Sequence, residues 1–291
     1  MSVDILQEKI RKTKNPSVLE LNLSASDLPP HICAEEEGKG AAYGRFCREL
    51  LTALQGMVPA VRFSFTAFSV LGHDGLYRLS EAMKLAKELG FYVILDAPEL
   101  LSVNAAKLAA ESFLGEESLY PCDGLVIGGY LGSDIIKPFL PYCKKEKKDL
   151  FVVTRTANKS ASELQDLLAG GRLVHAAAAD HVNRYGADTA GKFGYIRVGI
   201  LAAASAAQSL KDLRAKYPKL FMILDGADYP NANAKNCANA FDKFGHGAVA
   251  VVGDAICAAW KQAEGEIEPV EAARDAALRM KKNLNRYVTI L

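Results

Sequence analysis

Residues 91–102, Phe-Tyr-Val-Ile-Leu-Asp-Ala-Pro-Glu-Leu-Leu-Ser, carry the clearest indication of architecture in this chain. The apolar run at 91–95 lies between a glycine and a proline, which predicts a strand buried on both faces, as in a parallel sheet. Asp96 follows where α/β barrels place their catalytic groups, so we expect its carboxylate to face a pocket. Three residues downstream of Asp96 carry no ionisable group: Pro98, Leu100 and Leu101. The stretch therefore indicates a catalytic scaffold whose reactive positions have been replaced.

Length and composition limit the classes of protein that this chain can represent. With 291 residues, half of them hydrophobic, the chain can bury a large core, either as one α/β barrel or as two smaller domains. A formal net charge of +1 gives no support for a basic face that binds nucleic acid. No apolar run approaches the ~20 residues that cross a bilayer, and the polar N-terminus does not resemble a signal peptide. We therefore expect neither a nucleic-acid partner nor a membrane partner.

The six cysteines show neither a Cys-x-x-Cys pair nor a regular spacing. Scattered thiols of this kind are typical of a reduced, cytoplasmic protein and do not predict a disulfide framework or a metal cluster. The sequence thus predicts a cytoplasmic location and no metal or other cofactor.

Strand-like apolar runs alternate with helical patterns along the whole chain. Strands are expected at residues 17–23, 60–65, 91–95, 124–127, 150–154, 196–201, 220–224 and 248–252. Helices are expected at residues 5–14, 41–57, 75–89, 105–113, 135–147, 160–169, 174–185, 209–216 and 269–287, with a further segment at 236–244. About eight strands, each followed by a helix, predict a single (β/α)8 barrel domain over residues 1–291. An open doubly wound sheet is the main alternative.

Several strings of residues, in order and at matching distances, resemble the orotidine 5′-phosphate decarboxylase family, in particular its longer bacterial branch. Asn-Pro-Ser-Val at 15–18 resembles the start of the family's first strand, and Tyr-Leu-Gly-Ser-Asp at 130–134 resembles the loop after its fourth strand. Phe-Val-Val-Thr-Arg-Thr-Ala-Asn at 151–158 is similar to its fifth strand and the Thr-Ser-Asn turn behind it. The resemblance implies a TIM barrel and a homodimer whose active sites lie at the subunit interface.

The positions that carry the family's chemistry are altered. The family removes CO2 from a pyrimidine ring that bears a ribose phosphate, and a lysine ammonium must stabilise and protonate the ring carbon. The resemblance puts that lysine two residues after the strand-three aspartate, in an Asp-x-Lys-x-x-Asp motif. Asp96 holds the first position, but Pro98 replaces the lysine and Leu101 replaces the second aspartate. Arg62 corresponds to the supporting lysine of strand two, and a guanidinium is a poor proton donor.

The implied binding positions differ as well. Asn22 corresponds to the aspartate that holds the ribose, and Ala157 to the serine that holds the pyrimidine. The phosphate loop after strand seven is represented by Asp-Gly-Ala-Asp-Tyr-Pro at 225–230, and the phosphate-clamping arginine of strand eight falls near Asp254. Asp225, Asp228 and Asp254 would repel a phosphate dianion where an arginine would bind it.

Each candidate residue also has a simpler explanation. Asp96 and Arg62 are either catalytic remnants or a structural ion pair across adjacent strands. The acidic residues Asp225, Asp228 and Asp254 line a ligand site, bind Mg2+ or Ca2+, or are solvated loop acids, and no metal site is predicted. Thr156 and Asn158 are expected to contact a ligand at the barrel mouth, although a cap on the following helix explains Asn158 or Ser160 equally well.

No serine–histidine relay is visible in the sequence, and two histidines of the helix at 174–185 are expected at the surface: His175 and His181.

Three functions remain open. The first is a non-catalytic relative that binds a small molecule or a partner, as a homodimer or as a heterodimer with an active homologue. The second is an enzyme with altered chemistry on a non-phosphorylated substrate at the barrel mouth, using Asp96, Arg62 and the acidic loops. The third is a working orotidine 5′-phosphate decarboxylase of pyrimidine biosynthesis. The loss of the lysine favours the first.

Overall fold

The computed structural model describes residues 2–24, 27–98, 102–263 and 267–291. Within these ranges, eight parallel strands form a closed barrel in the order β1-β10-β9-β8-β5-β4-β3-β2. The barrel strands are β1 (Ser17–Leu21), β2 (Ala60–Ser64), β3 (Tyr92–Asp96), β4 (Gly124–Ile127), β5 (Asp149–Arg155), β8 (Ile196–Ala203), β9 (Leu220–Asp225) and β10 (Ala248–Val252). Closure of the barrel confirms the predicted (β/α)8 fold and excludes the open sheet.

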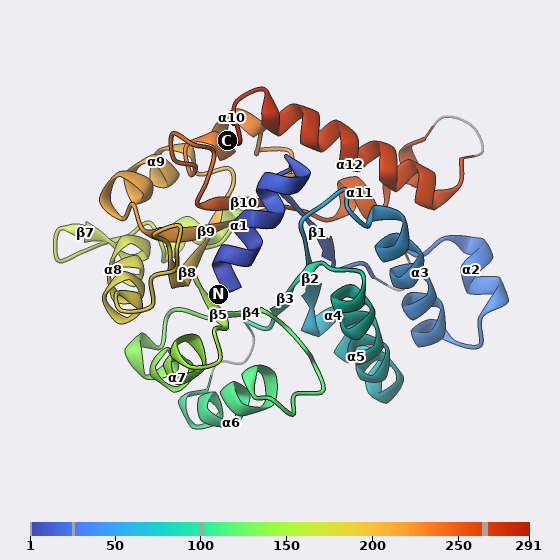
Figure 1. The fold of residues 1–291 in the computed structure, drawn as a ribbon, viewed down its shortest axis with the longest axis horizontal. Coiled ribbons are helices and arrows are strands. Elements are labelled where there is room, and N and C mark those ends of the chain that lie inside the picture. Colours follow the sequence, from blue (N-terminus) through green and yellow to red (C-terminus); the bar gives the residue numbers. More distant parts are fainter. Residues whose placement is uncertain (1, 25–26, 99–101, 264–266) are drawn as a thin grey trace.

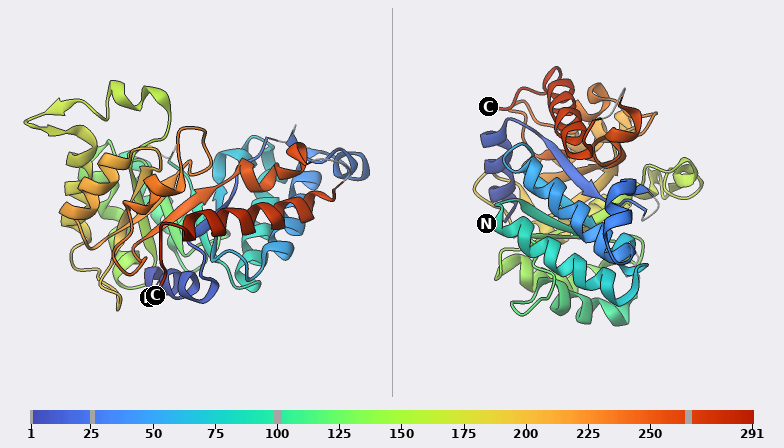
Figure 2. Two further views of the ribbon diagram at one scale, coloured as in Figure 1. Left: turned by 90° about the horizontal axis from the view of Figure 1, so that it is seen from above. Right: turned by 90° about the vertical axis from the view of Figure 1, so that its right-hand side faces the viewer.

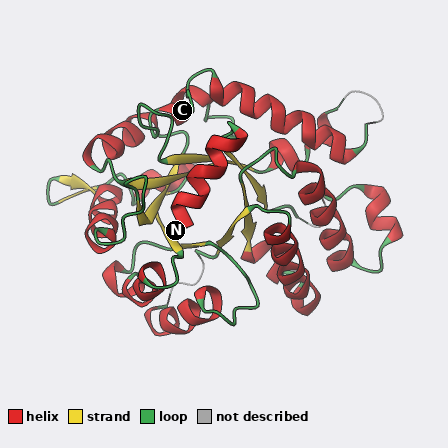
Figure 3. Cartoon of the chain, in the orientation of Figure 1, coloured by secondary structure: helices red, strands yellow, loops and turns green. Residues whose placement is uncertain are grey.

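Helices surround the barrel (Figures 1 and 3). They are α1 (Ser2–Thr13), α2 (Pro30–Glu35), α3 (Lys39–Leu54), α4 (Phe65–Ser69), α5 (Gly72–Glu88), α6 (Val103–Leu114), α7 (Leu140–Lys144), α8 (Val174–Gly186), α9 (Ala207–Lys216), α10 (Ala234–Ala238), α11 (Asp254–Cys257) and α12 (Pro269–Asn285). None of the described helices is long and apolar enough to span a membrane.

The six cysteines are all free thiols, as predicted.

Two predicted helices are wrong, and local sequence explains both. The segment 160–169 instead contains a short 3-10 helix, η4 (Lys159–Glu163), and the start of a hairpin that pairs β6 (Leu168–Ala169) with β7 (Arg172–Leu173). Gly170 and Gly171 connect these strands with φ of 59° and 79°, the conformation that a tight two-residue hairpin turn requires. The glycine pair therefore favours a hairpin over the continuation of a helix.

The segment 135–147 is broken rather than continuous. It consists of the end of η2 (Gly132–Ile135), then η3 (Lys137–Phe139), and α7. Pro138 lies in η3 and Pro141 near the start of α7. Because proline lacks a backbone N–H and crowds the preceding turn, two prolines at this spacing prevent one continuous helix.

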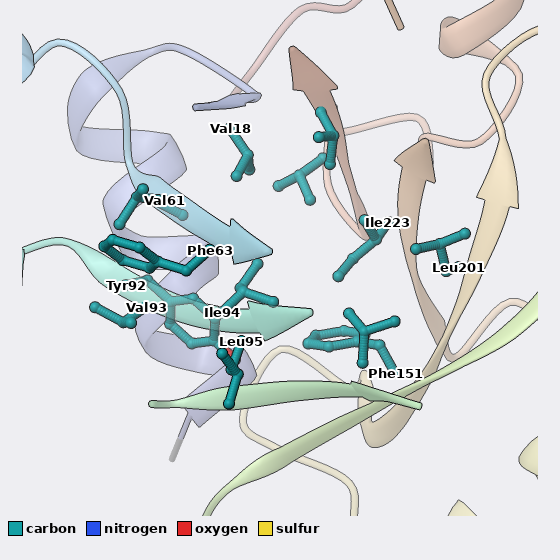
Figure 4. Packing of buried hydrophobic residues seen from close by; sticks show 14 of the residues in the cluster. Val18, Val61, Phe63, Tyr92, Val93, Ile94, Leu95, Phe151, Leu201 and Ile223 are labelled. Atoms are coloured by element: carbon teal, nitrogen blue, oxygen red, sulfur yellow. The ribbon is translucent and has the colours of Figure 1, made fainter. Parts of the chain in front are cut away.

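The core occupies the space that the strands enclose (Figure 4). Side chains from β3, β5 and β9 meet there, among them Ile94, Phe151 and Ile223, all of which are fully buried, whereas Phe63 of β2 packs outward near Phe68 of α4, with ring centroids 6.2 Å apart. This packing leaves the carboxyl ends of the strands, where the polar groups gather, as the place for a site.

Helix α1 closes the end of the barrel opposite those carboxyl ends (Figure 2). The Asp4 carboxylate accepts hydrogen bonds from the N–H groups of Lys192 at 3.1 Å and Phe193 at 3.2 Å, and the Gln7 side-chain oxygen accepts one from Gly247 at 3.1 Å. These amides lie just before β8 and β10, so α1 ties together loops at the amino ends of two strands.

We predict that Ile10→Ala lowers the free energy of unfolding by about 2–5 kcal/mol, because Ile10 is fully buried on the face of α1 that packs on the barrel. Ile5→Ala is the matched control on the same helix. Its side chain is 41% exposed, so the change should stay within about 0.5 kcal/mol. Urea unfolding followed by circular dichroism measures both. Equal losses would mean that α1 does not seal the barrel.

Candidate functional site

Four charged side chains at the carboxyl end of the barrel form what we call the mouth cluster: Glu20, Arg62, Asp96 and Asp225. The Nη2 atom of Arg62 donates to Glu20 Oε1 at 2.5 Å and to Asp225 Oδ1 at 2.6 Å. The barrel fixes these positions, because Glu20 and Arg62 are register partners on β1 and β2, while Asp96 and Asp225 are the last residues of β3 and β9. One guanidinium thus links strands on two sides of the mouth.

The mouth cluster is buried and carries an excess of acidic groups. The Arg62 side chain is only 4% exposed. Burial lowers the pKa of its guanidinium, but the charges of Glu20, Asp96 and Asp225 together raise that pKa well above its ordinary value. Three carboxylates oppose this single cation. The cluster therefore favours ligands that bring positive charge or hydrogen-bond donors.

Burial strongly perturbs the Glu20 carboxyl group of the mouth cluster. Burial raises the pKa of Glu20 to about 7; the charge of Arg62 opposes this rise, while the charges of Asp225 and Asp96 add to it. A carboxyl group with this pKa exchanges its proton near neutral pH, which is the property that general acid–base chemistry needs. Glu20 is therefore suited to take up or release a proton near neutral pH.

Asp228 joins the loops after β9 and β10. Its Oδ2 atom accepts hydrogen bonds from the N–H groups of Gly253 at 2.9 Å and Ala255 at 3.1 Å. The turn that presents Asp228 depends on Gly226, whose φ is +65° and whose added Cβ would lie 2.7 Å from the Tyr229 ring. A carboxylate of the chain itself thus occupies backbone donors at the mouth that an anionic ligand could otherwise use.

Asp228 and Asp254 line a cavity of about 630 Å3 beside the mouth, which we call the acidic cavity. Asp27 also lines it and pairs with Lys261 at 2.8 Å. Burial raises the pKa of Asp254, and the neighbouring charges of Asp228 and Asp27 raise it further. Within the described ranges, no group of three or more His, Cys, Asp or Glu side chains could hold a metal ion.

The structure separates the three acidic residues that the sequence grouped. Asp225 belongs to the mouth cluster through Arg62, whereas Asp228 and Asp254 belong to the acidic cavity. The pairing expected for Arg62 with Asp96 is one part of a larger arrangement, since Arg62 makes its short contacts with Glu20 and Asp225. Pro98 is half-buried just after β3, and Leu101 lies outside the described residues.

Asn22 is exposed and lines a separate cavity of about 450 Å3 with Ser24 and Lys39.

Thr156 and Asn158 bond within the loop after β5. The N–H of Thr156 donates to Gln165 Oε1 at 2.8 Å, and Asn158 Nδ2 donates to Ser160 Oγ at 3.0 Å. In the described structure no side chain caps η4, so the expected capping role is wrong. These two residues organise the loop that they belong to.

Sequence reasoning assigned no role to Glu20, which Arg62 holds in the mouth cluster. Its only signal was one carboxylate inside the otherwise apolar run at 18–21 of the first strand. A second error concerns His175, which was expected at the surface but is only 3% exposed. Glu20 pairs with Arg62 and His175 with Ser209, and each partner lies in another part of the chain. Local sequence therefore could not reveal either contact.

Known proteins resemble the chain over most of its length. It is 29% identical to the orotidine 5′-phosphate decarboxylase of Rhodopirellula baltica over 258 residues, 86% of this chain and 85% of that protein. It is 27% identical to the orotidine 5′-phosphate decarboxylase of Clostridium novyi over 287 residues, 98% of each. No family model matches the chain.

Solved structures share the fold. The OMP decarboxylase of Leishmania donovani superposes with a TM-score of 0.75 at 22% identity, over 99% of this chain and 98% of that chain. The orotidine 5′-monophosphate decarboxylase of Plasmodium berghei superposes with a TM-score of 0.75 at 15% identity, over 97% of this chain and 99% of that chain.

We predict that Glu20→Gln changes how stability depends on pH. In the folded protein the pKa of Glu20 is raised to about 7 from an ordinary value of 4.5, so folding retains a proton that the unfolded chain releases. The stability from this proton is present below about pH 4.5 and is lost as pH rises through about 7, by on the order of 3 kcal/mol. Glu20→Gln should remove this loss.

Urea unfolding at about pH 4.5 and about pH 8 measures the effect. Glu81→Gln is the control, because that side chain is exposed in a surface pair with Lys84. If the unaltered protein and Glu20→Gln lose the same free energy over this range, Glu20 does not hold the proton.

Proposed function

The chain is a homologue of the orotidine 5′-phosphate decarboxylases, as its resemblance predicted, and we propose that it does not catalyse their decarboxylation. In this proposal it is a non-catalytic relative that binds a neutral or cationic small molecule at the barrel mouth. The proposal rests on one observation above all. The Asp228 carboxylate accepts the N–H groups of Gly253 and Ala255.

The N–H groups of Gly253 and Ala255 lie just after β10, at the mouth of the barrel. In the family, the loops after the seventh and eighth barrel strands hold the phosphate of the substrate, and in this chain those loops follow β9 and β10. Backbone N–H groups at such a turn bind anions well. A phosphate entering here would have to displace a carboxylate that is already bound to both donors, and the nearby charge of Asp254 would repel it.

The mouth cluster also disfavours the family's substrate, here at the pyrimidine ring rather than at the phosphate. Arg62 is engaged by Glu20 and Asp225, so its charge is not available to a carboxylate or phosphate. Pro98 stands at the lysine position and has no ammonium group to stabilise a carbanion. An anionic nucleotide would therefore meet net negative charge without the cation that its reaction needs.

A second candidate is an enzyme with altered chemistry, and the raised pKa of Glu20 favours it. A buried carboxyl group that titrates near pH 7 can act as a general base on a non-phosphorylated substrate. The two candidates differ in a measurable way. Turnover that falls below about pH 7 and disappears in Glu20→Gln would support the enzyme.

We predict that the pure protein shows no decarboxylation of orotidine 5′-phosphate by ultraviolet absorbance and no binding of uridine 5′-monophosphate by calorimetry. Measurable turnover by the unaltered protein would overturn the proposal and identify a working decarboxylase.

Asp228→Ala tests directly whether the Asp228 carboxylate keeps phosphate from these backbone N–H groups. Removal of the carboxylate frees the N–H groups of Gly253 and Ala255, so inorganic phosphate should bind this variant more tightly than the unaltered protein. Asp254→Ala is the matched control, because it removes one negative charge from the same cavity without freeing those donors. Equal phosphate binding by the two variants would attribute the effect to charge alone and contradict the proposed role of Asp228.

Assembly forms part of the proposal. The family resemblance implies a homodimer, and we propose that this chain dimerises with itself or with an active homologue. Light scattering after size exclusion should give twice the mass of one chain. A monomer at all concentrations would exclude self-association and leave only a heterodimer, which co-expression with an active homologue would test.

A further inference from the structure

Beyond the mouth cluster, three side chains form a chain of contacts where the loop after β5 meets α8 and the start of α9. His175 Nε2 lies 2.9 Å from Ser209 Oγ. His175 Nδ1 lies 3.2 Å from Asp166 Oδ1 and 3.0 Å from the carbonyl oxygen of Gln165. The sequence showed no such relay, because His175 and Ser209 are 34 residues apart and meet only through the packing of the barrel.

The contacts fix the proton of the imidazole ring. Nδ1 of His175 faces two acceptors, the Asp166 carboxylate and the Gln165 carbonyl, so Nδ1 carries the hydrogen of the neutral ring. Nε2 is then the bare nitrogen and accepts the hydroxyl hydrogen of Ser209. This is the tautomer in which a histidine can remove a proton from a serine.

Asp166 is held in place from its other side. Arg155 donates to it through Nε at 3.0 Å and Nη2 at 2.9 Å, a two-point contact with both carboxylate oxygens. These hydrogen bonds lower the pKa of Asp166 despite partial burial, so the group stays ionised. A fixed, charged carboxylate beside Nδ1 stabilises the imidazolium that forms when His175 takes up a proton.

The relay opens onto a cavity of about 530 Å3 that all three side chains line. This volume suits a small molecule. The rest of the lining is largely apolar, with Leu173, Ala176, Ala206, Ala207 and Leu213. Ser209 is half-buried, so its hydroxyl can meet a molecule that enters from solvent.

Helix α9 places backbone donors beside the serine. Ser209 is the third residue of this ten-residue helix, and the amides of a first helical turn have no acceptor within their own helix. Within the described structure no side chain caps this end of α9. The positive end of the helix dipole therefore lies near Ser209 and favours negative charge there.

We propose that Ser209, His175 and Asp166 form an acyl-transfer site that hydrolyses small esters with a short apolar acyl group. Ser209 Oγ forms a bond to the ester carbonyl carbon while His175 Nε2 takes the hydroxyl proton. The carbon–oxygen bond to the alcohol breaks, and His175 returns the proton to the alcohol as it leaves. Water then attacks the acyl carbon while His175 Nε2 accepts its proton; the carbon–oxygen bond to Ser209 breaks, His175 returns the proton to Ser209 Oγ, and the carboxylic acid is released.

Asp166 is a positioning residue in this proposal, since it acts through His175. The relay shares no residue with the mouth cluster or with the acidic cavity. The alternative is that the contacts of His175 with Ser209 and Asp166 only hold α8 against α9, in which case Ser209 would be unreactive.

A fluorophosphonate reagent tests the proposal, because it phosphonylates an activated serine with loss of fluoride. We expect the intact protein to be labelled at Ser209, as located by peptide mass spectrometry, and to hydrolyse p-nitrophenyl butyrate. Ser209→Ala should abolish both. His175→Gln should lower the labelling rate by at least about 100-fold. Ser162→Ala is the matched control, since this exposed hydroxyl lies outside the relay and should leave both unchanged.

Asp166→Asn distinguishes positioning from support of the fold. It should lower the maximal labelling rate by about tenfold or more while the reagent concentration at half-maximal rate stays the same. Circular dichroism and melting temperature show whether each variant is folded. The proposal is overturned if the unaltered, folded protein is not labelled at Ser209, or if Ser209→Ala hydrolyses the ester as fast as the unaltered protein.

Discussion

The ion pairs of Arg62 with Glu20 and Asp225 are the interaction on which the barrel mouth depends. They join β1 and β2 on one side of the barrel to β9 on the other, in a place where the side chain of Arg62 is almost fully buried. A buried guanidinium is tolerated only when carboxylates surround it, and the same carboxylates lose a large part of their stabilisation without it. The Arg62 guanidinium is therefore paired with Glu20 and Asp225, so an anionic ligand would have to compete with these two carboxylates for it.

In the loops after β9 and β10, a carboxylate of the chain likewise binds groups that an anionic ligand could use. Asp228 takes the N–H groups of Gly253 and Ala255, and so a side chain of the chain fills a place that suits an anion. In both places a charge of the protein satisfies a partner that a nucleotide would otherwise engage. The polar groups of the mouth are thus paired with one another, and burial raises the pKa of Glu20 to about 7, so this carboxyl group can exchange a proton near neutral pH.

The fold was largely predictable because each barrel strand is a short apolar run. β4 and β10 have the predicted bounds, and the other strands differ by a few residues. The errors fall where turn-forming residues compete with a helical pattern. Gly170 and Gly171 form a hairpin in place of a helix, and Pro138 and Pro141 divide another helix into short pieces.

The site was less predictable than the fold. Arg62, Asp96 and Asp225 were recognised as candidates, but Glu20 was not, and the three loop acids proved to belong to two different places. Side chains that meet across a barrel come from strands far apart in the chain. Periodicity reports which face of a strand or helix is apolar, but it contains no information on which residues face each other across the closed barrel.

By itself, the sequence determined the alternation of strands and helices, because burial of apolar runs is a local property that each segment carries, whereas closure into a barrel was decided by the tertiary structure. It also determined that a proline stands two residues after Asp96, because that is a matter of residue identity. Only the tertiary structure decided that Glu20 faces Arg62, that Asp228 reaches two amides of another loop, and that His175 meets Ser209. The physical reason is that barrel closure and strand register set these distances, and both arise only when the whole chain has packed.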